Sequence, residues 1–183
     1  MVTRQKLGGT NFSFFILNQL PVFPPSAYAE HDCEYIAPRV LELTYTAWNV
    51  KPFGDDIWRS FKQGVRDWIG HVADDKLDVP EWVELSADRI PYPPCRWNEE
   101  RRLRLRAELD AYYARLSRDD LRYILDPSEI FGNDFPGETF RLLKEREHSE
   151  FGEYRTRRLV LDAFDKLAES RAFATRCQAA NLR

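Results

Sequence analysis

The apolar residues of one segment recur at the spacing of an α-helix. They stand at positions i, i+4, i+7 and i+11, which predicts a single buried stripe along that helix. The stripe consists of Leu105, Leu109, Tyr112 and Leu116. Asn98 precedes the segment as a good N-cap, and Glu99 and Glu100 add negative charge where the helix dipole favours it. Such a helix needs other elements to cover its apolar face.

Further helices are predicted from the same periodicity and from signals at their ends. Pro38 suits the first turn of one helix, and Ser117 with Asp120 forms a capping box at the start of another. The stretch from about 72 to 94 has no clear period and contains four prolines, so we expect an acidic loop there. The predicted helices cover about 38–50, 55–71, 98–116, 117–125, 138–148 and 153–169.

The fold class predicted by these elements is mainly α. We expect a helical domain with an irregular, proline-rich N-terminal segment and an acidic loop insertion. Hydrophobic residues make up 43% of the 183-residue chain, which is enough for a packed core although 31% of the residues are charged. No apolar run reaches the ~20 residues of a membrane span, and no signal peptide is recognisable, so we expect a cytoplasmic protein without a membrane partner.

The three cysteines and the few histidines do not form a recognisable framework. Cys33, Cys95 and Cys177 are odd in number and widely scattered, whereas disulfide and zinc sites show close pairs. We therefore expect reduced thiols. His31 and Cys33 could supply two metal ligands, but two more at a suitable spacing are missing, so no metal site is predicted.

Five strings occur in one order along the chain. They are FFILNQLPVFPPSAY, PRVLELTYTAW, RWNEERRLRLRAELDAYYARL, SRDDLRYILD and FPGETFRLLKEREHSEFGEYRTRRLVLDAFD. Together they resemble the C-terminal end of adenine-specific DNA methylases from restriction-modification and related phage-defence systems, the type IIG-like family. The resemblance covers about 7–48 and 96–165. The stretch 55–90 departs from it and is interpreted as a variable insertion.

This resemblance implies a domain organisation and a partner. Residues 1–30 would be the remnant of the end of a target-recognition domain, and 31–183 a C-terminal helical domain with the insertion at about 52–95. The chain would be the DNA-recognition and scaffold segment of an adenine-N6 DNA methyltransferase. Its catalytic domain would lie on another chain or be lost from a truncated gene. We expect the apolar segment Phe12–Leu20 to form part of an interface, because the rest of that domain is missing.

The residues of adenine methylation chemistry are missing from the sequence. That reaction needs a glycine-rich turn for S-adenosylmethionine and an Asn/Asp/Ser-Pro-Pro-aromatic loop for the flipped base. Tyr92-Pro93-Pro94-Cys95 and Phe23-Pro24-Pro25-Ser26 share only the prolines with that loop, and Gly8-Gly9 is too short for the turn. We predict no catalytic and no cofactor-binding residue here, and S-adenosylmethionine would bind the missing catalytic domain.

Two arginine runs are the candidates for contact with DNA phosphates. Arg155, Arg157 and Arg158 lie at a predicted helix N-terminus, where cations are unfavourable and an external anion would relieve the strain. Arg101 and Arg102 are the second candidates, since guanidinium groups suit phosphates. Pairs at i, i+4 such as Glu100 with Arg104 favour the interpretation of that second run as the solvated face of a helix, with contact to DNA or a partner as the alternative.

Two alternative functions stay open at the level of the sequence. The chain could be a helical protein-interaction module, or a small metal-dependent nuclease. The nuclease hypothesis depends on Asp74-Asp75-Lys76, with Asp55, Asp56 or Asp67 as upstream metal ligands. The neighbours of that triplet do not resemble a strand, which favours a solvated acidic loop.

Overall fold

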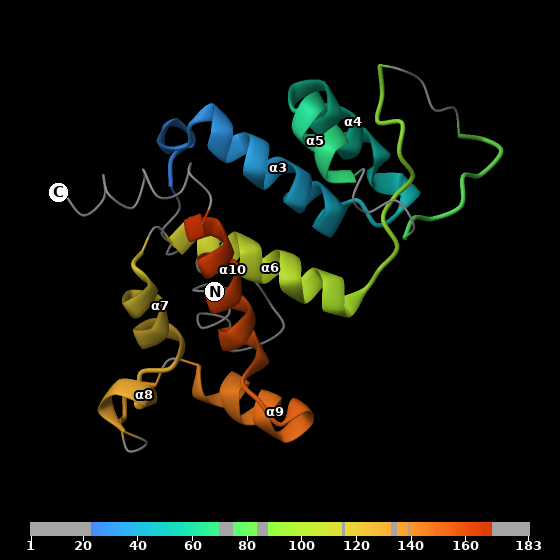
Figure 1. Cartoon of the computed structure of the whole chain (residues 1–183). Coiled ribbons are helices and arrows are strands. Elements are labelled where there is room, and N and C mark those ends of the chain that lie inside the picture. Colours follow the sequence, from blue (N-terminus) through green and yellow to red (C-terminus); the bar gives the residue numbers. More distant parts are fainter. Residues whose placement is uncertain are drawn as a thin grey trace, which may run out of the picture. The chain divides into compact units, whose positions relative to one another are not determined.

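The computed structural model describes residues 23–69, 75–83, 88–114, 116–132, 135–138 and 140–169. This part of the chain contains eight α-helices, and its only β pairing is an isolated bridge between Lys76 and Cys95 (Figure 1). The predicted mainly α fold class is thereby confirmed. Every helix in these ranges is too short or too polar to cross a membrane. The predicted interface segment Phe12–Leu20 lies outside the described residues.

The chain divides into two compact units, which we describe separately. Unit 2 spans Phe23–Leu105, and unit 1 contains the described residues from Arg106 onward, so the boundary falls within one helix. Unit 2 holds η1 (Pro25–Ala27), α3 (Glu30–Thr44), η2 (Trp48–Val50), α4 (Lys51–Ser60), α5 (Lys62–Ile69) and the first part of α6 (Glu99–Ala114). Unit 1 holds the rest of α6, then α7 (Arg118–Leu125), α8 (Ser128–Phe131), α9 (Arg141–Phe151) and α10 (Arg155–Glu169).

The start of α3 differs from the prediction. The helix begins at Glu30, and Pro38 lies inside it as a fully buried residue instead of in its first turn. Asp32 explains the earlier start, because its carboxylate accepts a hydrogen bond from the backbone N–H of Ala29 at 2.8 Å. The helix also ends earlier than predicted, at Thr44, and a short 3-10 turn follows.

The single helix predicted at about 55–71 is two helices in the structure. The chain bends at Phe61, whose φ of −133° is not helical, so that α4 and α5 both pack against α3. Gly64 allows the approach of α5 to α3, because a Cβ there would lie 3.1 Å from the backbone carbonyl oxygen of Glu34. The core of unit 2 is formed by Leu41, Tyr45, Trp58, Val65 and Ile90.

The predicted acidic loop contributes to this core. Ile90 is fully buried, and its backbone N–H donates to Asp55 at 2.9 Å. Cys95 is buried as well, and its N–H donates to the carbonyl oxygen of Tyr45 at 2.8 Å. The last part of this stretch is therefore tied to α3 and α4, although its residues form no helix where the structure describes them.

The core of unit 1 lies between α6, α7 and α10. It consists of Ala107, Ala111, Leu121, Leu125, Val160, Leu161, Ala163 and Phe164. Only part of the predicted stripe on α6 is confirmed: Leu105 and Tyr112 are buried, whereas Leu109 and Leu116 are half-buried. Small alanines form the face that packs in this core, which a search for large apolar residues does not detect.

The predicted end signals in unit 1 are confirmed for α7. Ser117 accepts a hydrogen bond from the N–H of Asp120, and the Asp120 carboxylate accepts from the N–H of Ser117. The next helices begin later than predicted: α9 at Arg141 instead of Glu138, and α10 at Arg155 instead of Glu153. Gly152, with a φ of +75°, ends α9 and reverses the chain toward α10.

Candidate functional site

A cleft in unit 1 is lined by polar and charged side chains of α7, α8, α9 and α10 and of the segments between them. Its volume is about 550 Å³, and its charged lining is nearly balanced. Four arginines line it: Arg118, Arg122, Arg157 and Arg158. Four carboxylates line it as well: Asp126, Glu129, Glu153 and Asp162. We call this the arginine cleft.

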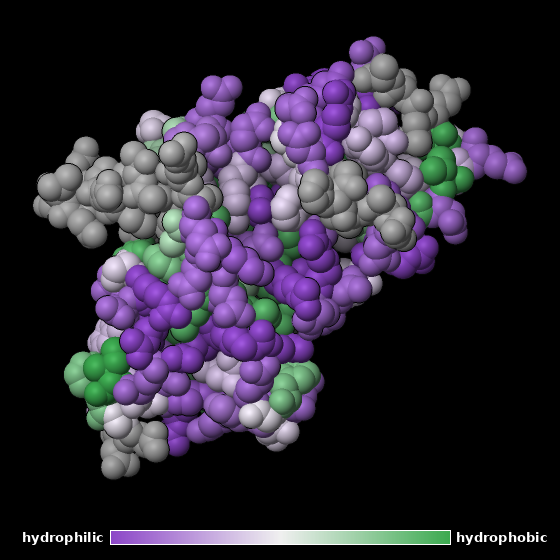
Figure 2. All heavy atoms as spheres, in the orientation of Figure 1, coloured by the Kyte–Doolittle hydropathy of each residue, from purple (hydrophilic) through white to green (hydrophobic). Residues whose placement is uncertain are grey.

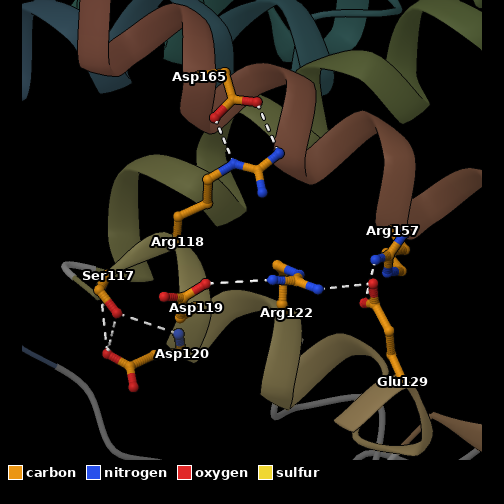
Figure 3. A network of polar contacts seen from close by, with 8 residues as sticks. All are labelled: Ser117, Arg118, Asp119, Asp120, Arg122, Glu129, Arg157 and Asp165. Atoms are coloured by element: carbon orange, nitrogen blue, oxygen red, sulfur yellow. Dashed lines mark hydrogen bonds and ion pairs between the residues drawn. The ribbon is translucent and has the colours of Figure 1, made fainter.

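The arginines of the cleft are held by carboxylates of the same unit. Arg118 makes a two-pronged pair with Asp165, with distances of 2.7 and 3.0 Å (Figure 3). Arg158 donates to Glu153 at 2.9 Å and lies 3.5 Å from Asp162. These contacts lower the pKa of Asp165 and that of Glu153, in each case chiefly through the hydrogen bond from the arginine.

The cleft is lined by two of the three arginines that the sequence ranked first for contact with phosphate. Arg157 and Arg158 are among its four arginines, whereas the guanidinium of Arg155 lies over the ring of Phe151, 3.7 Å from its centroid. The sequence search missed Arg118 and Arg122. They were detectable, because they follow the predicted cap at Ser117 and stand at i, i+4 on one face of α7.

The N-terminus of α10 already holds an internal anion. The carboxylate of Glu147 is buried and accepts from the backbone N–H of Thr156 at 2.7 Å and from its hydroxyl at 2.6 Å. At the N–H of Thr156, Glu147 therefore already takes the place that we expected an external anion to occupy. The groups of the cleft that can bind an anion are its guanidinium groups.

Two residues of the lining, Tyr154 and Arg157, each have a buried polar atom without a hydrogen-bond partner among the described residues. The side chain of Tyr154 is buried, and its hydroxyl has no hydrogen-bond partner within the described part of unit 1. Burial, followed by the nearby carboxylate of Glu147, raises the pKa of Tyr154 well above its usual value. The hydroxyl therefore stays protonated and can act only as a neutral group.

Arg101 and Arg102, the second candidates, belong to unit 2 and have internal roles there. Arg101 grips the buried carboxylate of Glu42 with two hydrogen bonds, at 2.8 and 3.1 Å. Arg102 donates to the carbonyl oxygen of Leu43 at 2.7 Å, and its guanidinium stacks over Trp97. Contact of these two residues with phosphate stays a prediction.

A partly buried cluster holds the backbone next to the cleft. Lys144 of α9 donates to Asp126, Ser128 and Glu138 at 2.8, 2.7 and 3.0 Å. The contact of Lys144 with Ser128 resembles a serine–lysine pair, but the pKa of Lys144 is raised. Burial alone would lower this pKa, and the hydrogen bonds to Asp126 and Glu138 outweigh the effect of burial. A protonated lysine cannot accept the serine proton, so the cluster is structural.

The stability contributed by this cluster should depend on pH with a defined sign. Burial alone would raise the pKa of Asp126, but hydrogen bonds from Lys144 and Ser128 lower it below its usual value. The stabilisation is therefore present above the unfolded pKa of about 4 and is lost as the pH falls through the folded pKa. We expect Lys144→Met to cost about 1–2 kcal/mol at pH 7, because two carboxylates lose their cation.

The measurement for this prediction is urea unfolding of both proteins between pH 7 and pH 3. The difference in the free energy of unfolding should shrink as the pH falls toward 3, because the carboxylates of the variant become neutral. Arg141→Met is the matched control on the same helix, since Arg141 and its partner Glu145 are both exposed. A difference that is independent of pH would contradict this role of the cluster.

The acidic residues of the nuclease hypothesis have internal partners in unit 2. Asp55 accepts from Lys51 and from the backbone of Ile90, and Asp56 pairs with Arg59. Lys76 lies over the ring of Tyr92. In the ranges that the structure describes, no three His, Cys, Asp or Glu side chains are grouped so that they could hold a metal ion. Asp74 lies outside these ranges.

No protein-family model matches the sequence, and the searches of curated proteins and of solved structures found no match either.

Proposed function

We propose that this chain is a DNA-recognition and scaffold segment of a restriction-modification adenine-N6 DNA methyltransferase, and that it contacts DNA phosphates through the arginine cleft. The observation that carries the proposal is the gathering of Arg118, Arg122, Arg157 and Arg158 along one cleft. The resemblance to the C-terminal end of type IIG-like methylases supplies the biological context. S-adenosylmethionine and the target adenine belong to the catalytic methylase domain or subunit, which is the proposed protein partner.

The ion pairs of the cleft are compatible with this proposal. Exposed ion pairs contribute little to stability, so a phosphate can replace one carboxylate partner at a small cost. Guanidinium groups bind phosphate oxygens in the same two-pronged way in which Arg118 binds Asp165. The proposed contacts position the DNA backbone and carry no base specificity.

The triple variant Arg155→Ala/Arg157→Ala/Arg158→Ala tests the function. In fluorescence anisotropy with labelled duplexes, the magnitude of the slope of log K against log salt should fall by about 0.9 for each phosphate contact removed. The fall should be similar for all duplex sequences, because phosphates are the same in each.

The control removes the same charge from exposed sites outside the cleft, with the variant Arg59→Ala/Arg104→Ala/Arg141→Ala. Each of these arginines forms a local ion pair within its own helix. The slope of log K against log salt for this control variant should stay close to that of the wild type. An equal fall in both triple variants, or no fall in the first, would refute phosphate contact at α10, and a loss confined to one duplex sequence would indicate base recognition instead.

A helical protein-interaction module is the second candidate function, and one observation favours it. Large hydrophobic side chains are exposed around α8, and hydrophobic surface is visible there (Figure 2). Phe131 is 59% exposed and stacks on Phe135, and Ile130 is 50% exposed. A chain that acts only through this surface would bind no duplex, so the anisotropy measurement also distinguishes the two functions.

A further inference from the structure

One carboxylate of the arginine cleft is shared by two arginines from different helices. Glu129 of α8 lies between Arg122 of α7 and Arg157 of α10 (Figure 3). One oxygen of Glu129 accepts from Arg122 at 2.8 Å, and its other oxygen accepts from Arg157. The remaining terminal nitrogen of Arg122 donates to Asp119 at 3.4 Å. Two guanidinium groups therefore converge on a single oxyanion.

This arrangement is also the one in which two arginines hold a phosphate group. A phosphate offers several anionic oxygens to guanidinium donors on two sides, and charge-assisted bonds of this kind are stronger than neutral ones. The three side chains are partly open to the cleft: 34% of Arg122, 35% of Glu129 and 26% of Arg157 is exposed. A ligand in the cleft can reach the pair without unfolding of the helices.

The backbone that carries Glu129 is held in place by its neighbours. Ser128, the preceding residue, is buried and bonded to Lys144 and Asp126. Hydrogen bonds from the neighbouring arginines, Arg122 first, lower the pKa of Glu129, so the carboxylate stays charged near neutral pH. Near neutral pH the carboxylate would therefore have to leave the arginines by rotation of its side chain and not by protonation.

We propose that Arg122 and Arg157 form a two-arginine phosphate site, and that Glu129 occupies the place of the phosphate until a ligand displaces it. The ligand is a phosphate group, either of a DNA backbone or of a free phosphate compound. The DNA arm rests on the function proposed above, whereas the free-phosphate arm does not. Glu129 thus lowers the affinity of the cleft for weakly held anions and favours ligands that present several phosphates at once.

In the first experiment, isothermal titration calorimetry measures the binding of inorganic pyrophosphate to the full chain at low salt. Glu129→Gln keeps the shape of the side chain and removes its charge, and we expect about tenfold tighter binding than in the wild type. Glu145→Gln is the matched control, because Glu145 pairs with Arg141 outside the cleft. The double variant Glu129→Gln/Arg157→Gln should lose the gain.

A second measurement uses the wild-type chain and does not depend on the folding of any variant. Pyrophosphate should shift the NMR signals of the side-chain Nε–H groups of Arg122 and Arg157, and leave that of Arg141 unchanged. No shift at either cleft arginine would overturn the proposal. An equal gain of affinity in Glu129→Gln and Glu145→Gln would also overturn it, because the effect would then be that of net charge.

The same variants separate this inference from the proposed function. If Glu129→Gln binds both pyrophosphate and duplex DNA more tightly, both stand. If it gains affinity for pyrophosphate only, the phosphate site stands and DNA contact at the cleft is refuted. If Glu129→Gln gains nothing while the α10 triple variant still reduces the salt slope for duplex DNA, the displacement of Glu129 is refuted and the function stands.

Discussion

Replacing Arg101 with methionine is expected to lower the free energy of unfolding by about 2–3 kcal/mol, less than the roughly 3–5 kcal/mol of a fully buried ion pair, because Glu42 is buried but 37% of the Arg101 side chain is exposed. Glu42 is 4% exposed and receives two hydrogen bonds from Arg101. In the variant its charge would keep only the indole N–H of Trp68, which donates at 2.6 Å. Urea unfolding followed by tryptophan fluorescence measures the loss.

Two comparison variants make this result specific. Arg104→Met changes the same helix, but Arg104 and Glu100 are both exposed and stand at i, i+4, so the loss should stay near 0.5 kcal/mol or below. Glu42→Gln combined with Arg101→Met removes the uncompensated charge and should restore part of the stability. Equal losses for Arg101→Met and Arg104→Met would contradict the role of Arg101 as the partner of the buried Glu42 carboxylate.

This prediction also affects how DNA binding by Arg101 variants is interpreted. The sequence places Arg101 and Arg104 in one arginine run, but only Arg104 has acidic residues four positions before and after it. The pair of Arg104 with Glu100 is visible in the sequence, and the structure contains it. The partner of Arg101 is 59 residues away, so no local rule identifies it. A loss of DNA binding in an Arg101 variant would therefore need a stability measurement beside it.

The parts of the fold that local chemistry determines could be predicted. Asn98 accepts from the N–H of Arg101 at 2.9 Å, and Ser117 with Asp120 forms the expected reciprocal cap. The break between α4 and α5 has only a weak local signal, because Ser60 is the one turn-favouring residue next to Phe61. The glycine that permits the packing of α5, Gly64, was a usable signal that the helix approaches another element closely.

Some residues of the candidate site could likewise be predicted from the sequence and others could not. Arg157 and Arg158 could be found from the charge pattern, and Arg118 and Arg122 could have been found from the cap before them. The role of Glu129 could not, because it depends on three helices meeting through one side chain. The sequence argument from an empty helix N-terminus failed for a similar reason: Glu147 reaches Thr156 across the reversal at Gly152.

The other large loss of stability is expected from a leucine in the core of unit 1. Leu161→Ala should lower the free energy of unfolding by about 2–5 kcal/mol, because Leu161 is buried in the core of unit 1 with Leu125, Val160 and Phe164. This is a large share of the roughly 5–15 kcal/mol of a typical domain. Leu109→Ala is the matched control: the sequence places both leucines in the core, but Leu109 is half-buried and should lose about 1 kcal/mol. Urea midpoints of the two variants measure the difference, and a loss for Leu109→Ala as large as that for Leu161→Ala would mean that the buried face of α6 includes Leu109.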